Sequence, residues 1–112
     1  MALRFPLHVR RGPDFSSQVE AWEKQVREGR GTRSKKAAQR LKEVRRLESM
    51  FPRKPFLGRN VPKNLIPRKY AAEGVTNLFR NDLPDGWRLL HTVMEVDTEQ
   101  AVIELEALSH DE

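Results

Sequence analysis

Four side chains in the C-terminal third of this 112-residue chain have chemistry suited to a phosphodiester. Arg80 and Arg88 are the only Lys or Arg residues of that third, and His91 and His110 follow them. Arginine stabilises charge that develops on a phosphorane, and histidine can carry the proton of a 2′-hydroxyl or of a leaving group. We therefore take Arg88, Arg80, His110 and His91 as candidate catalytic residues for metal-independent RNA cleavage.

A β-hairpin would position both arginines. Two runs rich in apolar and β-favouring residues, 76–83 and 87–96, flank Pro84-Asp85-Gly86, whose residues favour a tight turn. On strand 87–96 the spacing of three places Arg88 and His91 on opposite faces unless a bulge intervenes.

A last strand is predicted at 101–108, after a connection at 97–100. Its alternation places Ile103, Leu105 and Ala107 on one face and Glu104 and Glu106 on the other. This strand would bring His110 to the side of the two arginines.

The charge of the chain is strongly asymmetric. Residues 1–70 hold 19 Lys/Arg and six Asp/Glu, a balance of +13, whereas residues 71–112 have a balance of −8. Such a basic block favours a polyanion, with nucleic acid ahead of a membrane or an acidic protein, and a solvated helical surface is the alternative. The residues that we assign to RNA binding are Lys35, Lys36, Arg40, Lys54, Arg59, Lys63, Arg68 and Lys69.

The first half predicts a strand over 3–9 and then two helices joined at Gly29 and Gly31. Helical spacing defines two apolar stripes, which are Phe15, Val19, Trp22 and Val26 on the first helix and Ala37, Leu41, Val44, Leu47 and Phe51 on the second. The expected N-caps are Asp14 or Ser16 for the first helix and Thr32 or Ser34 for the second.

These elements predict one α+β domain of order β-α-α-β-β-β. Residues 1–51 form the strand and the basic helical hairpin, 52–74 a proline-rich basic loop with one helical turn near 68–73, and 75–112 the remaining strands. We expect an antiparallel sheet with the helical hairpin packed on one face.

Several functional classes are excluded by composition. The chain has no cysteine, which removes disulfides and thiolate–zinc sites and fits a reducing compartment. Its histidines are scattered, and it carries no phosphate loop or dinucleotide fingerprint, so we expect no metal and no cofactor. Ser109-His110-Asp111 cannot converge as a triad because adjacent residues diverge on a strand. No signal peptide or apolar span is visible, so a soluble cytoplasmic protein is expected.

One phrase of the sequence resembles a known family. L-F-R-N-D-L-P-D-G-W-R-L-L-H-T-V, followed by A-V-I-E-L-E-A-L-S-H-D-E, is similar to the RelE/ParE superfamily of type II toxins, and most like RelE-like proteins with a proline-rich insert before the hairpin. The match is best over 52–112. It implies a RelE-like fold, a ribosome-dependent mRNA endonuclease, and an antitoxin protein that holds it inactive. In this resemblance Arg88 matches the arginine that contacts the scissile phosphate, Arg80 a basic position, and His110 a terminal histidine.

The sequence also departs from that family pattern. His91 stands where Tyr is usual, Asp82 where a basic residue is common, and Asp111 where Arg or Lys usually follows the histidine. Relatives also continue beyond the position of Glu112 into a segment with a tyrosine. Two alternatives therefore stay open: a non-cleaving RelE-fold protein that binds ribosomal RNA, and a ParE-like inhibitor of a protein such as gyrase.

Overall fold

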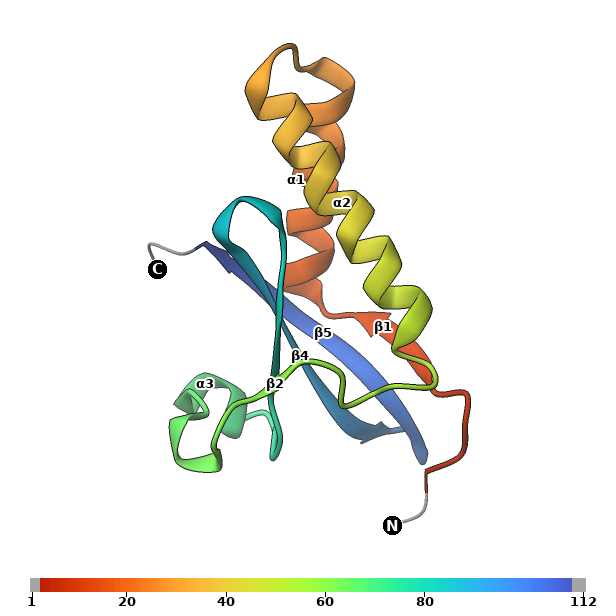
Figure 1. Cartoon of the computed structure of the whole chain (residues 1–112). Helices are drawn as coiled ribbons and strands as arrows, with labels where there is room; N and C mark the ends of the chain where they lie inside the picture. The colour runs from red at the N-terminus through yellow and green to blue at the C-terminus, as the bar shows by residue number, and fades with distance from the viewer. Residues whose placement is uncertain (1–2, 110–112) are drawn as a thin grey trace.

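A pair of helices lies against one face of a five-stranded sheet in the computed structural model, which describes residues 3–109 (Figure 1). The elements in chain order are β1 (His8–Arg11), α1 (Pro13–Glu28), α2 (Thr32–Met50), β2 (Arg59–Asn60), a 3-10 turn (Lys63–Leu65), α3 (Arg68–Ala71), β3 (Phe79–Asp82), a second 3-10 turn (Pro84–Gly86), β4 (Trp87–Val96) and β5 (Glu99–Ser109). The α+β prediction is confirmed at this level.

The strand order is β1-β5-β4-β3-β2, and β1 runs parallel to β5 while every other pair is antiparallel. The sheet is therefore mixed, and the prediction of an antiparallel sheet is wrong at β1. Parallel neighbours need a long connection instead of a turn, and almost the whole chain, including both long helices, separates β1 from β5. The first strand is also shorter than predicted, because it begins at His8.

The two apolar stripes explain how α1 and α2 pack. Every residue of the α2 stripe is buried, and so are the first three of the α1 stripe, whereas Val26 is 37% exposed near the end of α1. The predicted caps are wrong, because Gly12 and Gly31 occupy the N-cap positions and no side chain caps either helix. Pro13 begins α1 because its fixed φ suits the first helical position.

The predicted hairpin is present, and the last two strands form a second one. β3 and β4 pair around Pro84–Gly86, where Asp85 and Gly86 have φ of 66° and 75°. The link from β4 to β5 is tighter than predicted, since only Asp97 and Thr98 separate the strands, both with positive φ. The segment expected to be irregular contributes β2, a fifth strand, because Arg59 and Asn60 pair with Arg80 and Phe79.

A β-bulge lies between β4 and β5. Leu90 is opposite Glu106, but the next residue, His91, is opposite Glu104, so Leu105 is the extra residue. The bulge reverses the alternation along β5, so that Glu104 lies with the buried Val102 on the face toward the helices while Glu106 lies on the other face. The prediction that Glu104 shares an outer face with Glu106 is wrong for this reason.

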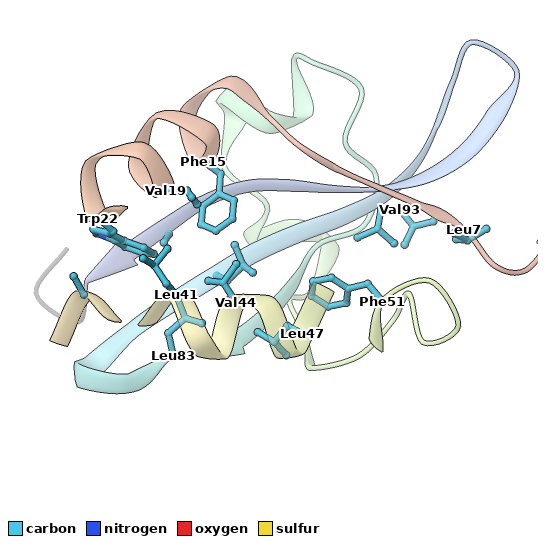
Figure 2. Packing of buried hydrophobic residues seen from close by; sticks show 14 residues of the cluster. Leu7, Phe15, Val19, Trp22, Leu41, Val44, Leu47, Phe51, Leu83 and Val93 are labelled. Atoms are coloured by element: carbon cyan, nitrogen blue, oxygen red, sulfur yellow. The ribbon is translucent and has the colours of Figure 1, made fainter. Parts of the chain in front are cut away.

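The two faces of the sheet have separate apolar clusters. The main core, between the sheet and α1–α2, contains Leu89 and Val93 of β4 together with the helical stripes (Figure 2). Leu90, on the other side of β4, belongs to a smaller cluster with Tyr70, Val75 and Leu78, so residues 61–78 cover part of the second face. We call this second face the open face. Within residues 3–109, no helix has the length and apolar character needed to cross a membrane.

Candidate functional site

The hairpin places Arg80 and Arg88 on the open face. Arg80 is opposite Leu90, and Arg88 is opposite Asp82 on β3 and Leu108 on β5. Residues paired across strands share a face, and alternate residues of one strand do too. The two arginines are therefore diagonal neighbours on adjacent strands, a relation in which the Cα atoms usually lie about 7–8 Å apart. Both are half-buried.

A third arginine joins them through β2. Arg59, on the edge strand β2, is directly opposite Arg80 on β3, so these two cations are neighbours across the strand pair. Within residues 3–109, neither guanidinium makes an ion pair or a hydrogen bond. Like charges at such positions destabilise a sheet unless an anion lies between them. We call Arg59, Arg80 and Arg88 the arginine cluster.

An open groove of about 610 Å³ borders the arginine cluster along the edge of β3. Its lining residues come from the second half of α2, from the loop before β2 and from β3, and are Glu43, Arg46, Leu47, Met50, Leu57, Gly58, Arg59, Arg80, Asn81 and Asp82. Arg46 is held by two hydrogen bonds of 2.7 Å to Glu43, which leaves Arg59 and Arg80 as the uncompensated cations of the groove. Gly58 has φ of 107°, and a Cβ there would lie 2.6 Å from the carbonyl oxygen of Arg80. Glycine therefore allows the loop to approach β3 closely.

His91 is not part of the site. Its ring is fully buried on the opposite side of β4, stacked between Phe51 and Phe79 at 4.4 and 5.3 Å. Nε2 lies 2.7 Å from the carbonyl oxygen of Pro55, and Nδ1 lies 2.8 Å from the side-chain amide of Asn81. Burial lowers the pKa of His91 to about 4, against the opposing effect of the Pro55 carbonyl. A neutral ring without access to solvent cannot carry a proton to a ligand on the open face, so the catalytic assignment of His91 is wrong.

Arg40 is also unavailable for the RNA contact predicted from the sequence. Its side chain is 6% exposed and its guanidinium lies 4.8 Å from the ring centre of Trp22 and 5.1 Å from that of Trp87. Desolvation lowers the pKa of Arg40, although the nearby Asp85 raises it. The register of α2 turns Arg40 inward, because it lies between Ala37 and Leu41 of the buried stripe.

The other residues assigned to RNA binding are exposed but lie in separate regions. Lys35 and Lys36 lie near the start of α2, at the top of Figure 1, whereas α3 is at the bottom. The loop and α3 residues are Lys54, Arg59, Lys63, Arg68 and Lys69. Lys69 is already paired with Glu106, 2.7 Å away, and the hydroxyl of Tyr70 donates to the same carboxylate. Arg59 is thus the residue of this set that the fold brings to Arg80.

Sequence reasoning missed a buried carboxyl, that of Glu104, beside the half-buried Glu48. Glu104 is fully buried, and none of the described residues donates a hydrogen bond to its carboxyl oxygens. Burial and the neighbouring Glu48 raise the pKa of Glu104 to about 10, so it keeps its proton at pH 7. Arg11 holds Glu48 with hydrogen bonds of 2.8 and 2.9 Å. Glu104 faces inward because of the bulge, and no residue pattern in the sequence marks that bulge.

His110 lies outside the described residues, and so does Asp111. β5 ends at Ser109, and its Leu108 is opposite Arg88. No family model, curated protein or solved structure matches this chain. The arginine cluster is therefore the feature of the described residues from which we infer a function.

Proposed function

We propose that this protein binds single-stranded RNA on the open face, in the manner of a RelE-like protein that acts on ribosome-bound mRNA. The observation that carries the proposal is the direct opposition of Arg59 and Arg80, which have no carboxylate partner within residues 3–109. A phosphate between two guanidinium groups turns this repulsion into charge-assisted hydrogen bonds, which are among the strongest that proteins form.

Two further observations support a RelE-like arrangement. The arginines of the hairpin phrase lie on one face, on neighbouring strands, as contacts to one phosphodiester require. The positive charge of residues 1–70 also supplies a long-range field that attracts a polyanion, since their balance is +13. In this proposal the cluster positions the RNA backbone, and a cognate antitoxin would cover the same charged face.

A binding experiment tests the proposal directly. The affinity of a labelled single-stranded RNA, measured by fluorescence anisotropy, should fall with salt by about 0.7 in the log–log slope for each phosphate contacted. Arg59→Gln and Arg80→Gln should each weaken binding by about tenfold, or 1.4 kcal/mol.

The matched control is Arg27→Gln, which removes the same charge from an exposed position on α1. It should change the affinity less than twofold. A flat salt dependence, or equal losses in all three variants, would contradict an RNA site at the cluster. Inhibition of supercoiling by a protein without RNA affinity would instead indicate a ParE-like protein target.

Cleavage of ribosome-bound mRNA is the second candidate function. The pairing of Arg88 with Leu108 favours it, because it brings the last described segment of the chain, the end of β5, beside Arg88. His110 is then the remaining histidine for proton transfer, because His91 is buried and His8 lies at the far edge strand β1. Such a reaction needs no metal when arginines stabilise the phosphorane.

Mapping mRNA 5′ ends after incubation with translating ribosomes tests cleavage. Arg88→Ala and His110→Ala should each abolish new ends while RNA binding, which is spread over several cations, falls only modestly. An intact message at a high dose of the wild-type protein would exclude cleavage and leave the binding function. Loss of RNA binding together with cleavage in Arg88→Ala would assign Arg88 to affinity instead of chemistry.

A further inference from the structure

The turn between β3 and β4 lies beside α1 and α2 (Figure 1). Residues of this turn and of both helices line a second charged cavity, on the helical side of the sheet. Its volume is about 600 Å³, and the residues that line it are Trp22, Gln25, Thr32, Arg33, Lys36, Arg40, Asp85 and Trp87. Trp87 and Arg88 are consecutive on β4 and point to opposite faces. The cavity and the arginine cluster are therefore separate sites.

The inner wall of the cavity is a buried cation. Arg40 is more than nine-tenths buried between the two tryptophans, and its Nε has no hydrogen-bond partner in the described part of the chain. The nearest carboxylate is that of Asp85, whose Oδ2 lies 3.5 Å from Nη1. An arginine with an unused buried donor is costly to hold unless more negative charge reaches the cavity.

The mouth of the cavity is the N-terminal end of α2. No side chain caps this end, and its first turn has no acidic residue. The positive end of a helix dipole favours acids, yet Arg33 and Lys36 lie here instead. Lys36 also contacts Asp85, at 3.2 Å. This end of the helix and the buried guanidinium thus both attract an anion, for different reasons.

The charges of the lining residues specify the anion. Arg33, Lys36 and Arg40 contribute three positive charges, and Asp85 offsets one of them. We propose that this cavity binds a terminal phosphate group in its dianionic form, whose two charges would neutralise the remaining surplus. The phosphate would lie at the first turn of α2 between Arg33 and Lys36, and Asp85 is a competing anion already in place.

The two tryptophans of the chain, Trp22 and Trp87, both line this cavity, so intrinsic fluorescence reports on it alone. Titration of the full chain with inorganic phosphate should produce a saturable change in emission. The affinity for a nucleoside 5′-monophosphate should rise from pH 5 to pH 8, because the second pKa of a phosphate monoester is about 6. Absence of a saturable change at every pH would overturn the proposal.

Two RNA probes and a mononucleotide identify the source of the phosphate. A nucleoside 5′-monophosphate and a short RNA with a 5′-phosphate should both saturate the signal, and the same RNA with a 5′-hydroxyl should not. If the 5′-phosphorylated RNA binds more tightly than the mononucleotide, the natural ligand is the end of an RNA chain. If the two bind equally, the natural ligand is a free phosphorylated molecule. Equal responses to the 5′-phosphate and 5′-hydroxyl RNA would overturn a terminal-phosphate site.

Variants of exposed residues test the geometry with little risk to folding. Lys36→Ala should weaken phosphate binding by about tenfold, whereas Lys35→Ala, which removes an exposed lysine of the same helical turn that does not line the cavity, should change it less than twofold. Asp85→Asn should tighten binding, because it removes the competing anion while asparagine tolerates the positive φ of this position. Equal losses in the two lysine variants would mean that phosphate is attracted by the general surface charge and not by this cavity.

Arg80→Gln should leave this titration unchanged, so failure here and failure of the RNA proposal are distinguishable.

Discussion

The two faces of the sheet treat charged and polar side chains in opposite ways. On the helical face, His91 and Glu104 are fully buried and their charges are suppressed, by a lowered pKa in one case and a raised pKa in the other. On the open face, Arg59 and Arg80 stay charged and face each other without a counterion in the described part of the chain. The core between α1–α2 and the sheet thus uses His91 and Glu104 to build the fold, whereas the open face leaves charge available for a ligand.

The largest effect should come from His91→Leu. Leucine leaves the Pro55 carbonyl and the Asn81 amide without their partner and removes the stacking on Phe79, so we expect a loss of about 3 kcal/mol in the free energy of unfolding. Chemical denaturation measures it, and Arg27→Gln, at an exposed position of α1, is the comparison, with an expected change below about 0.5 kcal/mol.

Acid titration gives an independent check on His91. Its folded pKa of about 4 is below the ordinary 6.5, so the unfolded state takes up a proton first and stability should be lost between pH 6.5 and 4. The leucine variant should lack this contribution. If the leucine variant had wild-type stability but no longer acted on RNA, His91 would have a role at the RNA site and not in the fold.

Glu104→Gln should give the next largest effect, through the pH dependence of stability. The folded pKa of Glu104, about 10, lies above the ordinary 4.5, so its stabilising contribution is complete below pH 4.5 and declines as pH rises toward 10. Between pH 7 and 9 His91 adds no pH dependence, because its ring is neutral in both states. In this range the free energy of unfolding of the wild-type protein should fall by up to about 1.4 kcal/mol per pH unit because of Glu104.

Glutamine keeps a hydrogen-bond donor beside Glu48 and does not titrate. The variant should therefore have a flatter profile over the same range and exceed the wild-type protein in stability at pH 9, by about 2 kcal/mol. Denaturation curves at several pH values decide the matter. Parallel profiles for the two proteins would show that Glu104 is ionised in the folded state, and that the core carries an uncompensated charge.

The smallest effect, and the sharpest in sign, should come from Arg59→Ala without ligand. Removing one of two directly opposed arginines should raise stability by a few tenths of a kcal/mol, up to about 1 kcal/mol, while RNA affinity falls. Thermal denaturation at low salt measures the gain, and added salt should remove it because salt screens exposed charges. Destabilisation by this substitution would mean that Arg59 has a structural role like that of the polar groups on the helical face.

Much of the fold could be predicted from local patterns. The stripe from Ala37 to Phe51 and the turn at Pro84–Gly86 depend on residues close in sequence, and both are present as predicted. The caps failed because helix starts depend on one or two residues, and here Gly12 and Gly31 take those positions. β2 could not be predicted, since a two-residue strand has no periodicity and exists only because β3 lies beside it.

The candidate site divides in the same way. The sequence by itself determined that Arg80 and Arg88 share a hairpin and that the first 70 residues are strongly basic, because turn chemistry and charge are local properties. Only the tertiary structure decided which polar residues face a ligand. Burial of Arg40 and His91, the inward turn of Glu104 at the bulge and the pairing of Arg59 with Arg80 all depend on register between segments distant in sequence. A shift of one residue in any of these registers would exchange a buried side chain for an exposed one, and no local pattern fixes that choice.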